Sequence, residues 1–140
     1  MATAHREVVE WKQEYSVHIP SIDKQHRSLV AIIGHLQTAM LEGRTKQIIA
    51  PLFQSMNQYT KFHFEYEEQL LEQNGFPDLA AHRQEHARLV QQLKLLEAKY
   101  LNGSLNAGAP LMQFLRNWLL DHICAHDKGY SEYLREKGVG

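Results

Sequence analysis

Five histidines occupy positions where the sequence pattern otherwise calls for apolar core residues. The chain has nine histidines in 140 residues, and these five interrupt apolar stripes that repeat every three or four residues. They are His26, His63, His82, His86 and His122. A buried imidazole without a partner costs about 1–3 kcal/mol, so five in one core would consume most of the stability of a small domain. Metal coordination removes that cost.

One carboxylate shares a helix face with these histidines. Glu67 follows His63 by four residues, and His86 follows His82 by the same interval. In an α-helix this spacing places both side chains of each pair on one face, one turn apart. The neighbouring acids Glu65 and Glu68 do not share the His63 face, and we interpret them as surface residues.

A second carboxylate has a less regular spacing. Asp127 follows His122 by five residues, which is about 140° around an ideal helix. We expect it to reach the same centre from the flank or through a local distortion of the helix. Together, the imidazoles and two carboxylates exceed the ligands of one ion and suit two ions bridged by the carboxylates. Mixed ligation of this kind favours iron, manganese or zinc over calcium or magnesium.

The remaining histidines have simpler interpretations. A single histidine on an apolar stripe is more often a hydrogen-bonded core residue than a ligand, and only the alignment of five across several helices favours metal binding. His5, His18 and His35 are not expected to take part. His126 lies four residues beyond His122 and beside Asp127, so it is a weaker candidate ligand.

Four amphipathic helices are expected to position these residues. Apolar periodicity and terminal Gly, Pro and Ser residues predict helices over about 21–41, 45–74, 78–100 and 110–137, preceded by an arm over 1–20. Ser21 or Asp23 can cap the first helix, and Pro51 either lies in the first turn of the second helix or kinks it. The predicted fold is all-α: residues 1–140 form a single domain, an antiparallel up-down-up-down four-helix bundle with an N-terminal arm.

Composition narrows the class of protein. The hydrophobic fraction is 44%, the charged fraction 22% and the formal net charge −1, so nothing indicates a nucleic-acid partner. No stretch approaches the roughly 20 apolar residues of a membrane span, and the first residues do not resemble a signal peptide. Cys124 is the sole cysteine, which suits a reducing compartment. These features predict a cytoplasmic location.

Two other metal motifs need comparison with this pattern. The segment from His82 to His86, HRQEH, matches the HxxEH signature of a class of zinc peptidases, in which Glu85 would be the general base. That motif is short, and the chain is small for a peptidase cleft. Ferritin-like di-iron oxidases carry Glu-x-x-His on two helices, and no histidine here has a glutamate three residues before it.

In combination, four segments resemble the hemerythrin family, and specifically its single-domain bacterial members. These segments are IDKQH ending at His26, HFEYE from His63 to Glu67, HRQEH, and HICAHD from His122 to Asp127. The resemblance implies two iron ions bridged by Glu67, Asp127 and an oxo or hydroxo group. It also implies that His82, His86 and His122 bind one iron, and that His26 and His63 bind the other, which keeps an open position.

The resemblance further implies an oxygen pocket and a function. Around the bound oxygen it places Phe64, Trp118, Leu119 and Ile123, and it places Tyr130 near the centre. His18 stands in the arm where the family is expected to carry glycine. We therefore predict a non-enzymatic protein without catalytic residues that binds molecular oxygen reversibly, for carriage, storage or delivery, with an oxygen-consuming enzyme as the candidate recipient. The alternatives are a di-iron peroxidase or oxidase, or an oxygen or redox sensor. A zinc hydrolase or an iron-storage protein is less favoured.

Overall fold

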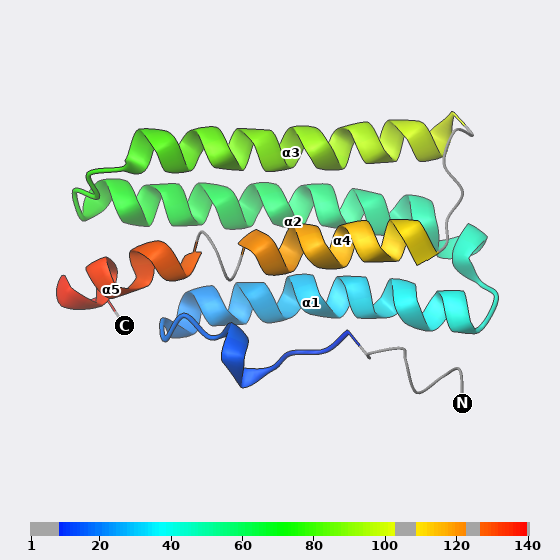
Figure 1. Cartoon of the computed structure of the whole chain (residues 1–140), viewed down its shortest axis with the longest axis horizontal. Helices are drawn as coiled ribbons and strands as arrows, with labels where there is room; N and C mark the ends of the chain where they lie inside the picture. Colours follow the sequence, from blue (N-terminus) through cyan, green and yellow to red (C-terminus); the bar gives the residue numbers. More distant parts are fainter. Residues whose placement is uncertain (1–8, 103–108, 123–126, 140) are drawn as a thin grey trace.

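The computed structural model describes residues 9–102, 109–122 and 127–139. Within these residues a 3-10 turn, η2, is followed by five α-helices. Their bounds are η2 Gln13–Tyr15, α1 Pro20–Leu41, α2 Thr45–Gln73, α3 Leu79–Leu101, α4 Ala109–Asp121 and α5 Lys128–Glu136. Figure 1 shows α1, α2, α3 and α4 side by side, with α5 continuing beyond the end of α4. Successive long helices run in opposite directions, which confirms the predicted all-α, up-down-up-down bundle.

The fourth predicted helix is not one continuous α-helix. The sequence pattern predicted a single helix over about 110–137, but α4 ends at Asp121 and α5 begins at Lys128. His122 and Asp127, between them, are both π-helical. The π-helical state of these two residues is a local departure from the α-helix, of the kind that Asp127 was expected to need. Ile123, predicted to line the oxygen pocket, and Cys124 and His126 lie outside the described residues.

The apolar core has two parts separated by the polar cluster. The larger part includes Leu29, Ile33, Phe53 and Leu115. The smaller part lies at the other end of the bundle and consists of Val17, Ile19, Ile22, Leu71, Tyr130 and Leu134. Along α1, His26 lies between Ile22 of the smaller part and Leu29 of the larger. The buried histidines therefore have packed apolar residues on both sides, which limits their movement.

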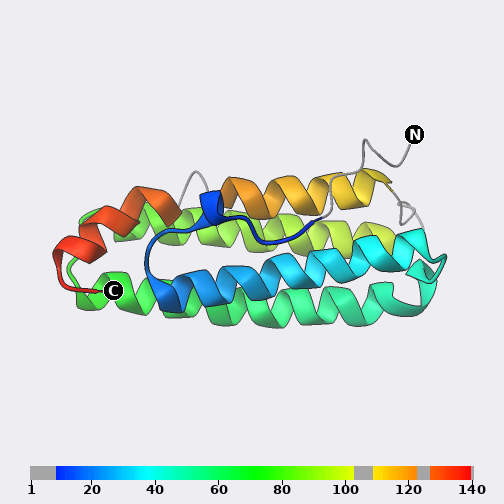
Figure 2. The same cartoon turned by 90° about the horizontal axis from the view of Figure 1, so that it is seen from below.

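The N-terminal arm is fastened to α1 by one carboxylate. The Val17 amide donates to Asp23 Oδ1 at 2.8 Å, and the Ser16 hydroxyl donates to Asp23 Oδ2 at 2.6 Å. Asp23 was a candidate cap for the first helix; instead α1 begins at Pro20 without a side-chain cap. Proline suits this position because its missing N–H would have no partner there. Figure 2 shows the arm running along the bundle between α1 and α4.

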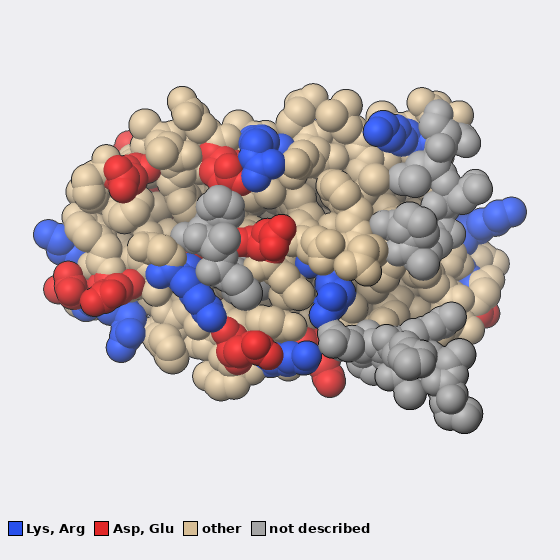
Figure 3. Space-filling view, viewed as in Figure 1, with Lys and Arg blue, Asp and Glu red and all other residues tan. Residues whose placement is uncertain are grey.

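Other features bear on the sequence predictions. Pro51 lies inside α2, beyond its first turn, so the first of the two alternatives is wrong. No described helix is both long enough and apolar enough to cross a membrane. On the face shown in Figure 3, basic and acidic side chains are interspersed.

Candidate metal centre

Seven side chains converge at the middle of the bundle from four sides. They are His26 on α1, His63 and Glu67 on α2, His82 and His86 on α3, His122 directly after α4, and Asp127 directly before α5. All seven are buried. His82 is the most exposed of them at 9%. The structure therefore brings together every residue that the sequence singled out as a metal ligand.

Their ligand atoms form two groups that share both carboxylates. The larger group is His26, His63, Glu67, His122 and Asp127, and the smaller group is Glu67, His82, His86 and Asp127. Within each group all the ligand atoms lie within 4.8 Å of one another. Two groups with two common carboxylates are the arrangement expected of two adjacent metal positions.

Glu67 directs one oxygen toward each group. Its Oε2 lies 3.1 Å from His63 Nε2, and its Oε1 lies 3.0 Å from His86 Nε2. The Tyr130 hydroxyl donates to Oε2, which places this tyrosine beside the centre. The carboxylate thus spans the two groups in a fixed orientation.

Asp127 is arranged in the same way. Its Oδ2 lies 2.5 Å from His26 Nε2 and 3.0 Å from His122 Nε2, while Oδ1 lies 4.0 Å from His82 Nε2. His122 and Asp127 thus approach each other although they are five residues apart, and both are π-helical.

Several polar atoms at the centre fit metal ions better than protein partners. Glu67 Oε1, Asp127 Oδ1, His82 Nε2 and His86 Nε2 are buried and make no hydrogen bond of acceptable geometry. A buried polar atom left unsatisfied costs about 1–3 kcal/mol, and four converging ones need a common explanation. Imidazole nitrogens with carboxylate oxygens form a donor set for iron, manganese or zinc. The residues present therefore fit a pair of transition-metal ions.

Electrostatics link the carboxylates to the histidines in the metal-free protein. Burial lowers the pKa of His122, but the facing carboxylates of Asp127 and Glu67 more than offset this and raise it to about 10. Burial and the neighbouring Glu67 raise the pKa of Asp127, yet His122 and His26 outweigh them and lower it to about 2. The pKa of Glu67 also falls well below its usual value, because its attraction to His63 and His122 exceeds the effect of burial. Without metal, protons on imidazoles balance the two buried carboxylates.

Two residues that the sequence analysis missed contact candidate ligand histidines at the ring nitrogen that faces away from the centre. The His63 Nδ1 lies 2.6 Å from Gln25 Oε1, and the His86 Nδ1 lies 2.7 Å from Glu68 Oε2. The interpretation of Glu68 as an ordinary surface acid was wrong, because its side chain is only 25% exposed and contacts His86. Both contacts cross between helices, so spacing within a single helix could not reveal them. The need of a ligand imidazole for an acceptor at its second nitrogen was the available signal.

The predicted pocket residues that the structure describes, Phe64, Trp118 and Leu119, are all buried. The Phe64 ring stacks on His86 with ring centroids 3.8 Å apart and an interplanar angle of 4°. The Trp118 indole donates to the Leu89 carbonyl at 3.1 Å. Together with Leu119, both aromatic residues belong to the larger apolar cluster. Of the three, Phe64 contacts the clustered histidines directly, so it gives His86 an apolar neighbour.

The peptidase motif is not assembled. Glu85 forms a hydrogen-bonded ion pair with Arg88 on the exposed side of α3. It belongs to neither ligand group, whereas His82 and His86, which flank it in the motif, both do. A general base for hydrolysis would have to face the metal. Of the histidines set aside earlier, His18 and His35 are exposed, and His5 is outside the described residues.

The allocation of His122 to one metal position is not decided by the geometry. The resemblance implied that it joins His82 and His86, whereas its ligand nitrogen groups with His26 and His63. Its ring centroid lies 5.4 Å from those of both His63 and His86. His122 thus stands at the boundary between the two groups, and the implied division of ligands stays a prediction.

Comparisons with known proteins agree with this geometry. Residues 17–134 match the family described as "Hemerythrin HHE cation binding domain". The chain is 30% identical over 125 residues to a bacteriohemerythrin of Pseudomonas aeruginosa strain LESB58, covering 89% of this chain and 80% of the relative. It is 29% identical over 121 residues to the bacteriohemerythrin of Methylococcus capsulatus strain Bath, covering 86% and 92%. A crystal structure of wild-type hemerythrin superposes with a TM-score of 0.79 at 26% identity, covering 91% of this chain and 98% of the other.

Proposed function

The chain belongs to the hemerythrin family, and from this premise we propose that it binds molecular oxygen reversibly at a non-haem di-iron centre formed by the seven clustered residues. The observation that carries the proposal is the pair of ligand groups with two shared carboxylates. A pair of ferrous ions held there would supply the two electrons that reversible oxygen binding requires. The proposed role is carriage, storage or delivery of oxygen rather than catalysis.

The chain's own residues would orient the metal positions and keep water away from them. Glu67 and Asp127 have an oxygen directed at each group, which suits bridging. Tyr130 holds Glu67 in place by a hydrogen bond. The apolar lining from Phe64 and Leu119 would exclude solvent from the open side, and a dry site slows the loss of electrons to water-assisted oxidation.

The deciding experiment is a spectroscopic oxygen cycle combined with metal analysis. We expect two irons per chain and an optical spectrum that changes on adding oxygen to reduced protein and returns when oxygen is removed. Continuous consumption of oxygen or peroxide would instead indicate an oxidase or peroxidase. One tightly bound zinc in protein from iron-replete cells would favour the hydrolase, and many more than two irons would favour iron storage. A sensor role would require that oxygen alters binding to a separate partner.

A further inference from the structure

Two of the clustered histidines form a hydrogen bond through Nδ1, the ring nitrogen that faces away from the centre, and the two acceptors differ in charge. Amide and carboxylate oxygens can only accept, so Nδ1 of His63 donates to Gln25 and Nδ1 of His86 donates to Glu68. Each Nε2 therefore presents its lone pair to the centre. The two rings share one tautomer, but one rests against a neutral amide and the other against an anion.

The two acceptors serve different metal positions. His63 belongs to the larger ligand group and His86 to the smaller one. A carboxylate accepts a stronger hydrogen bond from Nδ1–H than an amide does. The imidazole then carries more negative charge, and its Nε2 donates its electron pair to a metal more strongly. Glu68 therefore makes the position bound by His82 and His86 more electron-rich than an amide in its place would.

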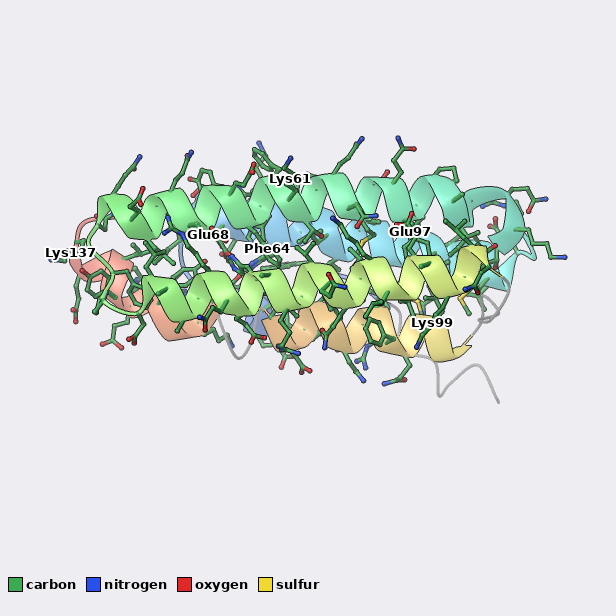
Figure 4. All side chains as sticks on the ribbon, turned by 90° about the horizontal axis from the view of Figure 1, so that it is seen from above. Lys61, Phe64, Glu68, Glu97, Lys99 and Lys137 are labelled. Atoms are coloured by element: carbon green, nitrogen blue, oxygen red, sulfur yellow. The ribbon has the colours of Figure 1, made fainter. Side chains whose placement is uncertain are left out.

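The carboxylate of Glu68 is fixed in this role from two sides. Its Oε1 lies 3.4 Å from the Nε of Arg83, whose side chain is about half exposed. Solvent screens that ion pair, so Arg83 orients Glu68 without cancelling its effect on His86, 2.7 Å away. The stacked ring of Phe64 holds His86 in place. Figure 4 shows Phe64 and Glu68 between α2 and α3.

We propose that Glu68 is a positioning residue that acts through His86 to lower the reduction potential of the metal position bound by His82 and His86. When the two irons differ in charge, this position then keeps the ferric state and the other the ferrous state. The inference rests on the proposed di-iron function. The redox step concerned is the transfer of one electron from ferrous iron to an added mediator, which is reduced in turn.

The test compares substitutions that change charge but keep the hydrogen bond. Glu68→Gln retains an acceptor for His86 Nδ1, so the ring keeps its tautomer. We expect it to shift the oxidation equilibrium toward ferrous iron by about tenfold, within the range of outer-shell effects on metal sites, which corresponds to about 59 mV for a one-electron couple. Gln25→Glu should lower the potential of the other position and reduce the difference between the two. Potentials are measured by mediated spectroelectrochemistry, and Mössbauer spectra locate the ferric iron.

Glu65→Gln is the matched control, because it removes the same charge from an exposed position on α2 outside both ligand groups. It should leave the potential unchanged. An equal shift in Glu65→Gln and Glu68→Gln would overturn the proposal, since charge at a distance would then suffice. An unchanged potential in Glu68→Gln with iron retained would also overturn it. If Glu68→Gln loses iron, the proposal is tested by Gln25→Glu instead. A lowered potential of the position bound by His63 would support it, and an unchanged potential would overturn it.

A second readout does not depend on iron chemistry. In zinc-loaded protein, the NMR resonance of the His86 Nδ1 proton should lie downfield of that of His63, and Glu68→Gln should move it upfield. Indistinguishable resonances in the wild-type protein would overturn the proposal. Failure of the proposed oxygen function is recognised separately, as fewer than two irons or an irreversible oxygen cycle in the wild-type protein.

Discussion

At the scale of single residues, the same motif contains members with opposite roles. In HRQEH, the imidazoles of His82 and His86 face the shared carboxylates, while Glu85 pairs with Arg88 at the surface. A helix directs positions one and five to one face and position four partly away from it. The sequence motif alone therefore does not distinguish the candidate ligands His82 and His86 from Glu85, which faces away from the centre.

His82→Ala and Glu85→Gln should accordingly have different effects. His82→Ala removes a ligand of the smaller group and should lower the iron content well below two per chain. Glu85→Gln should leave both the iron content and the oxygen spectrum nearly unchanged, because its carboxylate is directed at Arg88. Metal analysis and optical titration with oxygen check both. A hydrolytic activity abolished by Glu85→Gln, with metal still bound, would reject the oxygen-binding assignment.

Leu119 should control how long oxygen stays bound. It lies one turn before His122 and is 1% exposed, so its truncation opens space beside the proposed centre. We expect Leu119→Ala to retain both irons, to lose about 2–5 kcal/mol of unfolding free energy and to accelerate autoxidation. Decay of the oxygenated spectrum measures the effect.

The control for Leu119 is Leu115→Ala, since Leu115 is 0% exposed on the same helix but one turn farther from His122. It should have a similar cost in stability without faster autoxidation. Equal acceleration in both variants would mean that Leu119 is a packing residue only.

At the scale of elements, the arm contains a strained residue. His18 has φ of 62°, and it is the only described residue other than glycine with a positive φ. This conformation costs a residue with a Cβ about 1–2 kcal/mol, while glycine adopts it freely. The structure thus supplies a physical reason for the expected glycine at this position.

His18→Gly should stabilise the protein. The relief of strain is partly offset by the greater chain entropy of glycine in the unfolded state, so we expect a gain of up to about 1 kcal/mol. Urea unfolding of the metal-free protein measures it. His18→Ala keeps the Cβ and should give no such gain; equal stability of the two variants would show that the arm relaxes without strain.

At the scale of the whole molecule, the buried charges couple stability to pH and to metal. In the metal-free protein the pKa of His122 is about 10, above its unfolded value of 6.5. Its contribution to stability is fully present below pH 6.5 and is lost as pH rises toward 10. Asp127, with a pKa lowered to about 2, contributes stability above pH 3.8 that is lost as pH falls toward 2.

Metal should therefore stabilise the fold more strongly as pH rises. Coordinating imidazoles are deprotonated, so metal binding releases protons and competes with them at neutral pH. We expect the difference in Tm between metal-loaded and metal-free protein to grow from pH 6.5 to pH 9, with proton release visible in calorimetry. In His122→Gln, the loss of metal-free stability over this range should be smaller. A difference in Tm that is independent of pH would contradict this protonation scheme.

Local periodicity was enough to predict most of the helices and most of the side chains that converge at the candidate centre. His63 and Glu67, or His82 and His86, share a face because an α-helix repeats every 3.6 residues, whatever the rest of the fold does. The same rule selected Glu67 over Glu65 and Glu68. The arrangement of four such helices into a bundle followed because each has one apolar stripe to bury.

Only the tertiary structure determined how the elements meet. The use of Asp23 to hold the arm, the contact of Gln25 with His63 and the contact of Glu68 with His86 all depend on how separate elements pack together. Periodicity shows which face of a helix is buried, but not which side chain of the next helix lies opposite it. That depends on the relative shift and crossing of the helices, which packing of the whole core decides.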